Sequence, residues 1–328
     1  TLLPGERRRL HRGLAEVLEE DPSLAGSAPA GELAHHWHRA GDLARALAVS
    51  PDAAREAERV HATGEALTHV ERVVALWGQV PDPEAVTGLD RVALLAWEAA
   101  LAHDTGEVRR AVTVMEQAMA LLPDDADVHR RASMWERHAR YTSSADSIDV
   151  ARLSIDRAVA LVEDQPPSTV RTRVMLLHAQ DRWEEEPARA LEVCEAELEV
   201  TLARGDREGE GVARTLVGAC LSALGRRDEA AGHFRLALAI AEEHGSGEDV
   251  ARGHTLLTAC LIRSGRVVEG AELSLEGLRR ARALGVDRVW GPMLAGNATS
   301  GLYWSGRWDE AVELLAEVVG EGYGVGWL

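Results

Sequence analysis

Apolar residues recur along this chain with the spacing of amphipathic helices. A small anchor residue, usually alanine, is followed four positions later by a bulky residue and seven positions later by a small or branched one. This spacing places the apolar side chains on one face of a helix. The pattern therefore predicts helices along most of the chain. The clearest pairs at these two positions are Val70/Val73, Met115/Ala118, Ile155/Ala158, Phe234/Ala237 and Leu315/Val318.

The same pattern repeats at a nearly constant interval. Residues 217–230, 257–270 and 298–311 align without gaps, and their glycines at 225, 265 and 306 lie 40 and 41 residues apart. Residues 33–46 fit the same template, and weaker copies have their anchors at Ala66, Ala111, Ala151 and Ala190. From Ala111 onward the anchors step by 40, 39, 40, 40 and 41 residues. A fixed period of 20–50 residues indicates a repeat architecture.

Each position of the repeat has a structural role. The bulky residue of the first helix is expected in the core, and the small residue one turn earlier lets the partner helix approach. A glycine then ends the first helix, because glycine adopts the left-handed conformation of a helix C-terminus without steric cost. The core residues are Trp37, Leu221, Leu261 and Leu302; the small ones are Ala34, Gly218, Thr258 and Thr299; the terminating ones are Gly41, Gly225, Gly265 and Gly306.

This template resembles the tetratricopeptide repeat (TPR), in which a glycine precedes Ala-x-x-x-Phe and a closing proline. Ala230 with Phe234, and Ala111 with Pro123, match that signature. The period exceeds the usual ~34 residues, so each helix should be about a turn longer than in most TPRs. The resemblance implies an all-α, TPR-like α-solenoid superhelix of antiparallel helix pairs with a period of about 40 residues, covering residues 30–328 in seven to eight pairs.

Residues 1–22 do not fit the repeat and predict one amphipathic helix with Pro4 in its first turn. Together with Glu32–Asp42, they resemble the end of the winged-helix segment and the first TPR turns of large LuxR-type bacterial regulators (the MalT-like, STAND ATPase group). This resemblance implies an N-terminal ATPase, a central TPR sensor and a C-terminal helix-turn-helix. Only the sensor would be present here, so no cofactor is expected in this chain, and ATP would bind the missing ATPase.

In that group the TPR region receives a small effector or a regulatory protein or peptide and controls self-association. A constitutive TPR scaffold that binds a partner peptide or helix is the alternative. A Walker A sequence upstream and a helix-turn-helix downstream would favour the regulator. The residues after Gly320 are expected to form a turn before a further helix, and the lysine-free, Ala/Arg-rich composition is typical of an actinobacterial source.

Charge and composition narrow the possible functions. The net charge is −18, and all 36 basic residues are arginine. An acidic surface disfavours direct nucleic-acid binding, which depends on cations that neutralise phosphates. A chain without lysine also cannot carry a Walker A motif. Three cysteines without a CxxC pair, and the lack of a long apolar run, predict a cytoplasmic protein that neither spans nor binds a membrane.

Several residue clusters resemble catalytic or metal sites, but each has a simpler interpretation. Glu32 and His35-His36-Trp37-His38 contain metal-ligand types, yet Trp37 occupies a core position and the histidines are expected to be packing or surface residues. Cys220, Cys260 and Gly301 share one position that requires a small residue. The acidic runs at 124–125 and 184–186 lie at helix ends. We therefore expect no metal site and no enzymatic activity.

The first helix of each TPR lines the concave face, and its side chains between the core positions are candidates for binding. Aromatic and arginine residues there are typical anchors of ligands and partners. The alternative is that longer helices turn these side chains into the contacts between repeats. The predicted binding residues are Arg140, Arg182, Trp183, Thr215, Ser222, Arg252, Thr255, Arg263, Tyr303 and Trp304.

Overall fold

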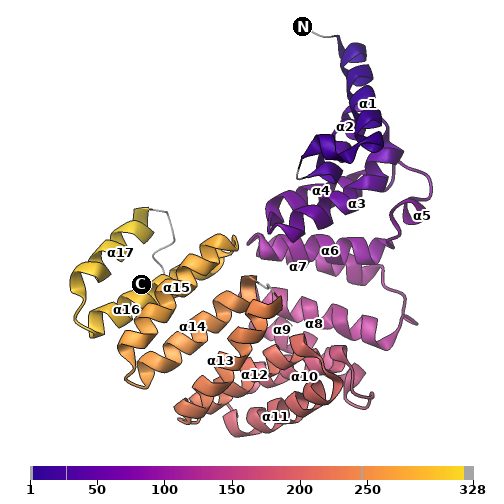
Figure 1. Ribbon diagram of the computed structural model, residues 1–328. Coiled ribbons are helices and arrows are strands. Elements are labelled where there is room, and N and C mark those ends of the chain that lie inside the picture. Colours follow the sequence, from indigo (N-terminus) through magenta and orange to yellow (C-terminus); the bar gives the residue numbers. More distant parts are fainter. Residues whose placement is uncertain (1–2, 27, 245–246, 321–328) are drawn as a thin grey trace. The chain divides into compact units, whose positions relative to one another are not determined.

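The computed structural model describes residues 3–26, 28–244 and 247–320, and all regular secondary structure within them is helical (Figure 1). The chain forms two compact units. One comprises the residues up to Asp127 together with Arg137–Ala151, and the other comprises Val128–Glu136 and the residues from Arg152 onward. The predicted all-α, TPR-like fold is confirmed.

The first unit contains the predicted N-terminal helix, which packs against the second helix, and the beginning of the array. Its helices are α1 (Pro4–Glu20), a 3-10 turn (Pro22–Ala25), α2 (Pro29–Ala40), α3 (Leu43–Arg59), α4 (Thr63–Leu76), α5 (Pro83–Thr87), α6 (Arg91–Asp104) and α7 (Val108–Ala120). Helix α3 packs on both α2 and α4, and α4 also contacts α6. The weak repeat at Ala66 is therefore a single helix inserted between two pairs.

The chain then continues through α8 (Val128–Ser144) and α9 (Ile148–Val162), each of which contributes residues to both units. The remaining helices of the second unit are α10 (Thr169–Arg182), α11 (Pro187–Arg204), α12 (Arg207–Ala223), α13 (Arg227–His244), α14 (Gly247–Arg263), α15 (Val267–Ala283), α16 (Asp287–Trp304) and α17 (Trp308–Gly320).

In the second unit every helix from α10 to α17 packs on its neighbours in sequence. The first helices of successive repeats also contact one another, α10 with α12, α12 with α14, and α14 with α16. Helices α11 to α16 each have 17 or 18 residues, and the turns between them are short. The additional residues of the ~40-residue repeat thus lengthen the helices, as predicted.

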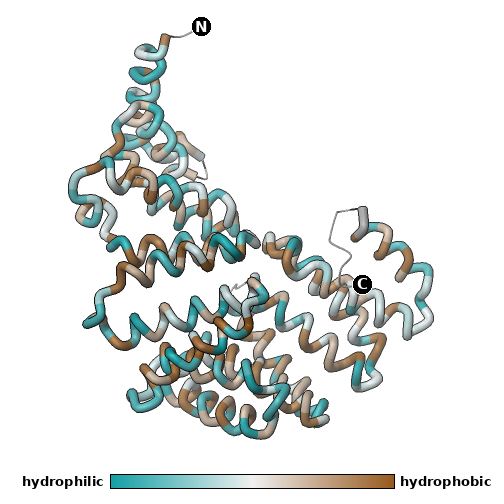
Figure 2. Tube along the Cα trace, turned by 180° about the vertical axis from the view of Figure 1, so that it is seen from behind, coloured by the Kyte–Doolittle hydropathy of each residue, from teal (hydrophilic) through white to brown (hydrophobic). Residues whose placement is uncertain are grey.

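The apolar stripe of each helix faces its neighbours, and Figure 2 shows hydrophobic positions recurring at short intervals along the helices. All four predicted core residues are buried, with Trp37, Leu221, Leu261 and Leu302 exposing at most 2% of their surface. Each of the four terminating glycines has a positive φ, from +79° to +82°. These glycines occupy the left-handed conformation that the repeat predicts.

The starts of α10 and α12 in the second unit are fixed by side-chain caps. The Ser168 hydroxyl accepts from the Arg171 amide at 3.2 Å and begins α10, while the Asp206 carboxylate accepts from the Gly209 amide at 2.9 Å and begins α12. Such caps satisfy amide groups that have no partner within the helix. They define where the two helices begin, and both helices contribute to the site described next.

Candidate functional site

A cavity of about 580 Å³ lies among the helices of the second unit. Its volume falls within the ~300–1,000 Å³ range of small-molecule sites. The first helices of four successive repeats line it: α10 near its end, α12, α14 and α16. Helix α13, the second helix of its repeat, adds Ala237, Ile240 and Ala241. Most of the wall is apolar, so the cavity offers a ligand a dry surface.

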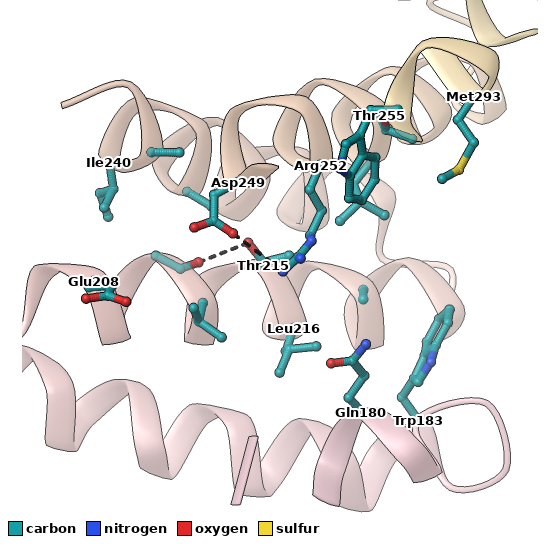
Figure 3. A pocket seen from close by; sticks show the side chains of 17 residues that line it. Gln180, Trp183, Glu208, Thr215, Leu216, Ile240, Asp249, Arg252, Thr255 and Met293 are labelled. Atoms are coloured by element: carbon teal, nitrogen blue, oxygen red, sulfur yellow. Dashed lines mark hydrogen bonds and ion pairs between the residues drawn. The ribbon is translucent and has the colours of Figure 1, made fainter. Parts of the chain in front are cut away.

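Helices α12 and α14 contribute more lining residues to the cavity than the other helices do. Figure 3 shows Glu208 and Ile240 toward one end of this space, and Trp183 and Met293 toward the other. Small residues in the lining, such as Ala219 of α12, contribute to this open volume.

Few polar groups enter the cavity, and one of them is a cation. The Arg252 guanidinium lies 3.5 Å from the Asp249 carboxylate and also pairs with Glu248. The guanidinium carbon lies 5.7 Å from the centre of the Trp290 ring, within cation–π range. Glu208 and Asp249 give the lining two carboxylates against one guanidinium, so the cavity carries a net negative charge at neutral pH.

Two threonines at equivalent repeat positions line the same wall. Thr215 donates its hydroxyl hydrogen to the Gly211 carbonyl at 2.9 Å, and Thr255 donates to the Ala251 carbonyl at 2.8 Å (Figure 3 for Thr215). Because each donor is already used by its own helix, these hydroxyl oxygens are left as acceptors. They suit a ligand that carries a hydrogen-bond donor.

Four of the ten residues predicted from the sequence lie together in this cavity: Trp183, Thr215, Arg252 and Thr255. The other six lie elsewhere. Arg263 donates to the Ser222 hydroxyl at 3.1 Å and bridges the ends of α14 and α12, and Arg182 lies 3.7 Å from Asp156. Tyr303 and Trp304 line a separate hollow between α16 and α17, and Arg140 lies on α8 in the first unit.

Sequence reasoning missed several lining residues that the repeat itself could have indicated. Met293 follows Arg252 by 41 residues, and Trp290 follows Asp249 by the same step. Each pair occupies one equivalent position in α14 and α16. Applying the 41-residue step to the predicted Arg252 would have identified Met293, whereas Asp249, the counterpart of Trp290, was itself missed. No sequence signal indicated the contribution of α13, because its lining residues belong to the apolar stripe of a second helix.

The acidic runs that resemble catalytic groups, at 124–125 and 184–186, are exposed and do not line this cavity. Two buried carboxylates outside the cavity, those of Glu197 and Glu210, form ion pairs with arginines. Glu197 lies 2.6 Å from Arg171, and Glu210 lies 2.7 Å from Arg214. The guanidinium groups of Arg214 and Arg207 outweigh burial and hold the pKa of Glu210 below its usual value. These pairs fit a role in packing.

The three cysteines are buried and unpaired. Gly301, the counterpart of Cys220 and Cys260 in the last repeat, faces the backbone of α15, where an added Cβ would lie 2.8 Å from the Ala271 Cβ. This contact supports the interpretation that the position requires a small residue. Burial raises the pKa of the Cys260 thiol, which therefore stays protonated.

The histidine cluster differs from expectation in one respect. Trp37 is in the core as predicted, and its indole nitrogen donates to Glu19 at 3.0 Å. However, His11 of α1 joins His35 and His36 of α2, and one potential ligand atom from each lies within 4.8 Å of the others. The sequence did not predict this cluster, because His11 lies in the N-terminal helix outside the repeat and His35 and His36 lie in the first repeat helix.

None of the helices in the described part of the chain combines the length and apolar character needed to cross a membrane. No model of a known protein family matches the chain, and no curated protein does.

Solved structures of helical-repeat proteins are similar to it. One is a Rap protein complexed with Competence and Sporulation Factor (13% identity, 96% of each chain covered, TM-score 0.59). Another is a STAND protein with a tetratricopeptide repeat sensor from Pyrococcus horikoshii (12% identity, 96% of this chain, TM-score 0.55). A third is aspartyl phosphate phosphatase F from Bacillus subtilis (14% identity, 90% of this chain and 85% of that one, TM-score 0.54).

This chain spans 46% of the length of the STAND protein. At such identities the likeness shows the fold alone. The fold and the comparisons define a TPR-like helical-repeat protein.

Proposed function

We propose that this chain is the sensing region of a LuxR-type, STAND-class ATPase regulator and binds a small effector in the cavity of the second unit. The observation that carries the proposal is the cavity itself, a largely apolar volume of about 580 Å³ formed by successive first helices. A TPR sensor attached to a STAND ATPase also exists among the similar structures. In this proposal the chain binds and signals without catalysing a reaction, in the cytoplasm.

The lining defines the chemistry of the effector. Apolar side chains and Trp183 favour a hydrophobic body, because burial of apolar surface supplies most of the binding free energy. The excess of carboxylates and the two threonine acceptors favour a neutral or cationic donor group. An anionic ligand would meet Glu208 and Asp249 and would find Arg252 already paired. The expected effector is therefore a drug-sized hydrophobic amine, amide or alcohol.

Binding would act on the array by joining repeats. A ligand in the cavity contacts α10, α12, α14 and α16 at once. It therefore stabilises the arrangement of these four helices that fits it best, and a ligand shifts a conformational equilibrium by its difference in affinity between states. In the whole regulator, that shift is proposed to control self-association.

A thermal-shift screen of paired hydrophobic amines and carboxylic acids of matched shape tests the proposal. We expect amines to raise the melting temperature of this chain and the matched acids to have little effect. Ala219→Phe, which fills the cavity, should reduce the shift, whereas Arg252→Gln, which removes the positive charge of the lining, should retain or increase the shift caused by amines. Trp304→Phe, in a separate hollow, is the matched control and should retain it. Equal shifts in the cavity-filled variant would refute this site.

A constitutive scaffold that binds a partner peptide or helix is the second candidate. The exposed aromatic residues of α16 and α17 favour it, since Tyr303, Trp304 and Trp308 expose 57%, 69% and 63% of their surface. Tyrosine and tryptophan are common anchors in protein interfaces. If Trp304→Ala abolished partner capture while Ala219→Phe did not, the scaffold function would replace the sensor.

A further inference from the structure

Three histidines meet where α1 packs against α2. His11 comes from the middle of α1, and His35 and His36 are consecutive residues of α2. The Nδ1 atoms of His11 and His36 lie 2.8 Å apart, and the ring centres of the three residues are 5.1–5.7 Å from one another. All three side chains are partly exposed, so an ion could reach them from solvent.

The spacing of the ligand atoms is compatible with a metal ion that would replace the hydrogen bond between His11 and His36. Zinc–nitrogen bonds of ~2.0–2.1 Å in a tetrahedron place the nitrogens about 3.4 Å apart. The three potential ligand atoms here lie within 4.8 Å of one another, and one pair lies at 2.8 Å. Small rotations of the partly exposed rings would equalise these separations.

A carboxylate is positioned to support one of the ligands. His36 presents Nδ1 to His11, and its other ring nitrogen, Nε2, lies 3.7 Å from Glu32 Oε2 one helical turn earlier. A metal-bound histidine commonly donates its second ring N–H to a carboxylate, which fixes the orientation of the ring. The Glu32–His36 pair is placed for this arrangement, although 3.7 Å is longer than a hydrogen bond and the two side chains would have to move closer.

We propose that His11, His35 and His36 bind a divalent transition-metal ion, with Zn²⁺ as the best match, and that Glu32 orients His36. Three imidazoles leave a fourth position for water or an anion. His35 also lines a hollow of about 470 Å³ with Arg8, Arg39 and Arg72. These guanidinium groups repel a bare cation and favour an anionic fourth ligand, which lowers the charge of the metal centre.

The bound ion would join α1 to the array. His11 is the only ligand on α1, whose exposed face includes Leu10, Leu14 and Val17 at 48–52% exposure. A metal bridge therefore adds stability at a helix with a small buried area. This proposal does not depend on the effector cavity, which lies in the other unit.

Titration of the metal-free chain with ZnCl₂, by calorimetry and thermal shift, tests the site. We expect one equivalent to bind and the melting temperature to rise. His11→Ala and His36→Ala should weaken binding at least 100-fold, and Glu32→Gln by about 10–100-fold. His38→Ala is the matched control, a neighbouring histidine outside the cluster, and should bind Zn²⁺ like the wild type.

Cobalt provides a second measurement that does not depend on variants. Co²⁺ bound in place of Zn²⁺ should show the intense visible absorption of four-coordinate cobalt, whereas binding by scattered surface groups gives the weak spectrum of six-coordinate cobalt. The proposal is overturned if His11→Ala and His36→Ala bind Zn²⁺ as tightly as His38→Ala. A six-coordinate cobalt spectrum of the wild-type protein would overturn it as well.

Discussion

Small residues at helix crossings set how closely the repeats pack. A Cβ added to Gly218 would lie 2.7 Å from the Phe234 ring, as the repeat predicted for this position. One added to Gly277 would lie 2.7 Å from the His254 Cβ, and no sequence signal marked that glycine. The repeat pattern therefore predicts close helix contacts at its template positions. It does not predict contacts at other positions, such as Gly277, that occur in one pair of helices only.

Gly301→Ala should destabilise the chain. The new methyl group would meet Ala271 Cβ at 2.8 Å and Ala271 Cα at 3.0 Å, and backbone cannot move aside as a flexible side chain can. Overpacking costs about 1–3 kcal/mol, against a gain of roughly 1 kcal/mol from replacing a helical glycine. We expect a net loss of about 1 kcal/mol in urea unfolding.

Gly232→Ala is the matched control for that substitution. Gly232 also lies within a helix, α13, but an added Cβ would meet nothing within 4 Å. Here the lower entropy of the unfolded chain should raise stability by about 0.5–1 kcal/mol. If both variants changed stability equally, steric contact at Gly301 would not be the cause.

Mild acid should destabilise the fold through buried histidines such as His254. Only 2% of its surface is exposed, and its Nδ1 lies 3.1 Å from the Leu273 carbonyl. Burial lowers the pKa of His254 below 6.5, although the Leu273 carbonyl and the carboxylates of Glu276 and Glu242 act in the opposite direction. The unfolded chain therefore binds more protons at this group, and stability falls as the pH drops below about 6.5.

The measurement is the unfolding free energy between pH 7.5 and 5.5. One such histidine contributes a slope of up to about 1.4 kcal/mol per pH unit below its unfolded pKa. His254→Gln should reduce this slope without abolishing it. The remaining slope comes from His69, His178 and His233, whose pKa values are also lowered by burial. An unchanged slope in the variant would show that His254 titrates normally.

At the scale of helices, the sequence predicted the elements well, but it predicted side chains on a concave face and not a cavity. Gly41 and Gly225 ended helices as the repeat required, and the steps after Ala111 became regular pairs. Helix α4 was not recognised as an inserted single helix, because Ala66 with Val70 has the same apolar spacing as a paired one. The spacing of apolar residues predicts which face of a helix is buried, but it does not predict how many other helices pack against that face.

The cavity illustrates the same limit. The positions of Trp183, Thr215, Arg252 and Thr255 were predicted because they follow from the register of the first helices. Its volume could not be predicted, since it depends on which side chains from several helices are small at one place. Tyr303 and Trp304 lie in a different hollow because they are at the end of α16, next to α17, whereas the start of α16 lines the cavity. The register of a helix predicts which way its side chains point, whereas the presence of a cavity depends on the sizes of the side chains on several neighbouring helices.

Substitutions at a terminating glycine should follow the order of left-handed preference. Gly265 has a φ of +82° between α14 and α15, with no atom within 4 Å of an added Cβ, so only backbone strain opposes a side chain. Asparagine tolerates this conformation better than alanine, and a branched residue tolerates it least. We expect Gly265→Asn to lose the least stability, Gly265→Ala about 1 kcal/mol, and Gly265→Val the most. Urea unfolding of the three variants would show a different order if the turn rearranged.

At the scale of the whole chain, many arginine side chains are held in ion pairs that join helices. The net charge is −18, and several arginines are held in ion pairs between neighbouring repeats, such as Arg307 with Glu272 and Arg235 with Glu269. Arginine thus serves the contacts between helices. The hollow lined by Arg8, Arg39 and Arg72 is a local exception to the acidic surface.

Repeat proteins distribute their stability locally, because each repeat is held by its neighbours. In the second unit, α16 packs on α14, α15 and α17, and α10 packs on α11 and α12. A defect introduced at Gly301 of α16 should therefore loosen the C-terminal repeats first. Hydrogen exchange of Gly301→Ala is expected to accelerate in α15–α17 and to remain unchanged in α10 and α11. Gly232→Ala should show no such acceleration in α15–α17. Uniform acceleration across the second unit would instead indicate a single cooperative core, in which case an effector bound in the cavity would stabilise all of its helices equally.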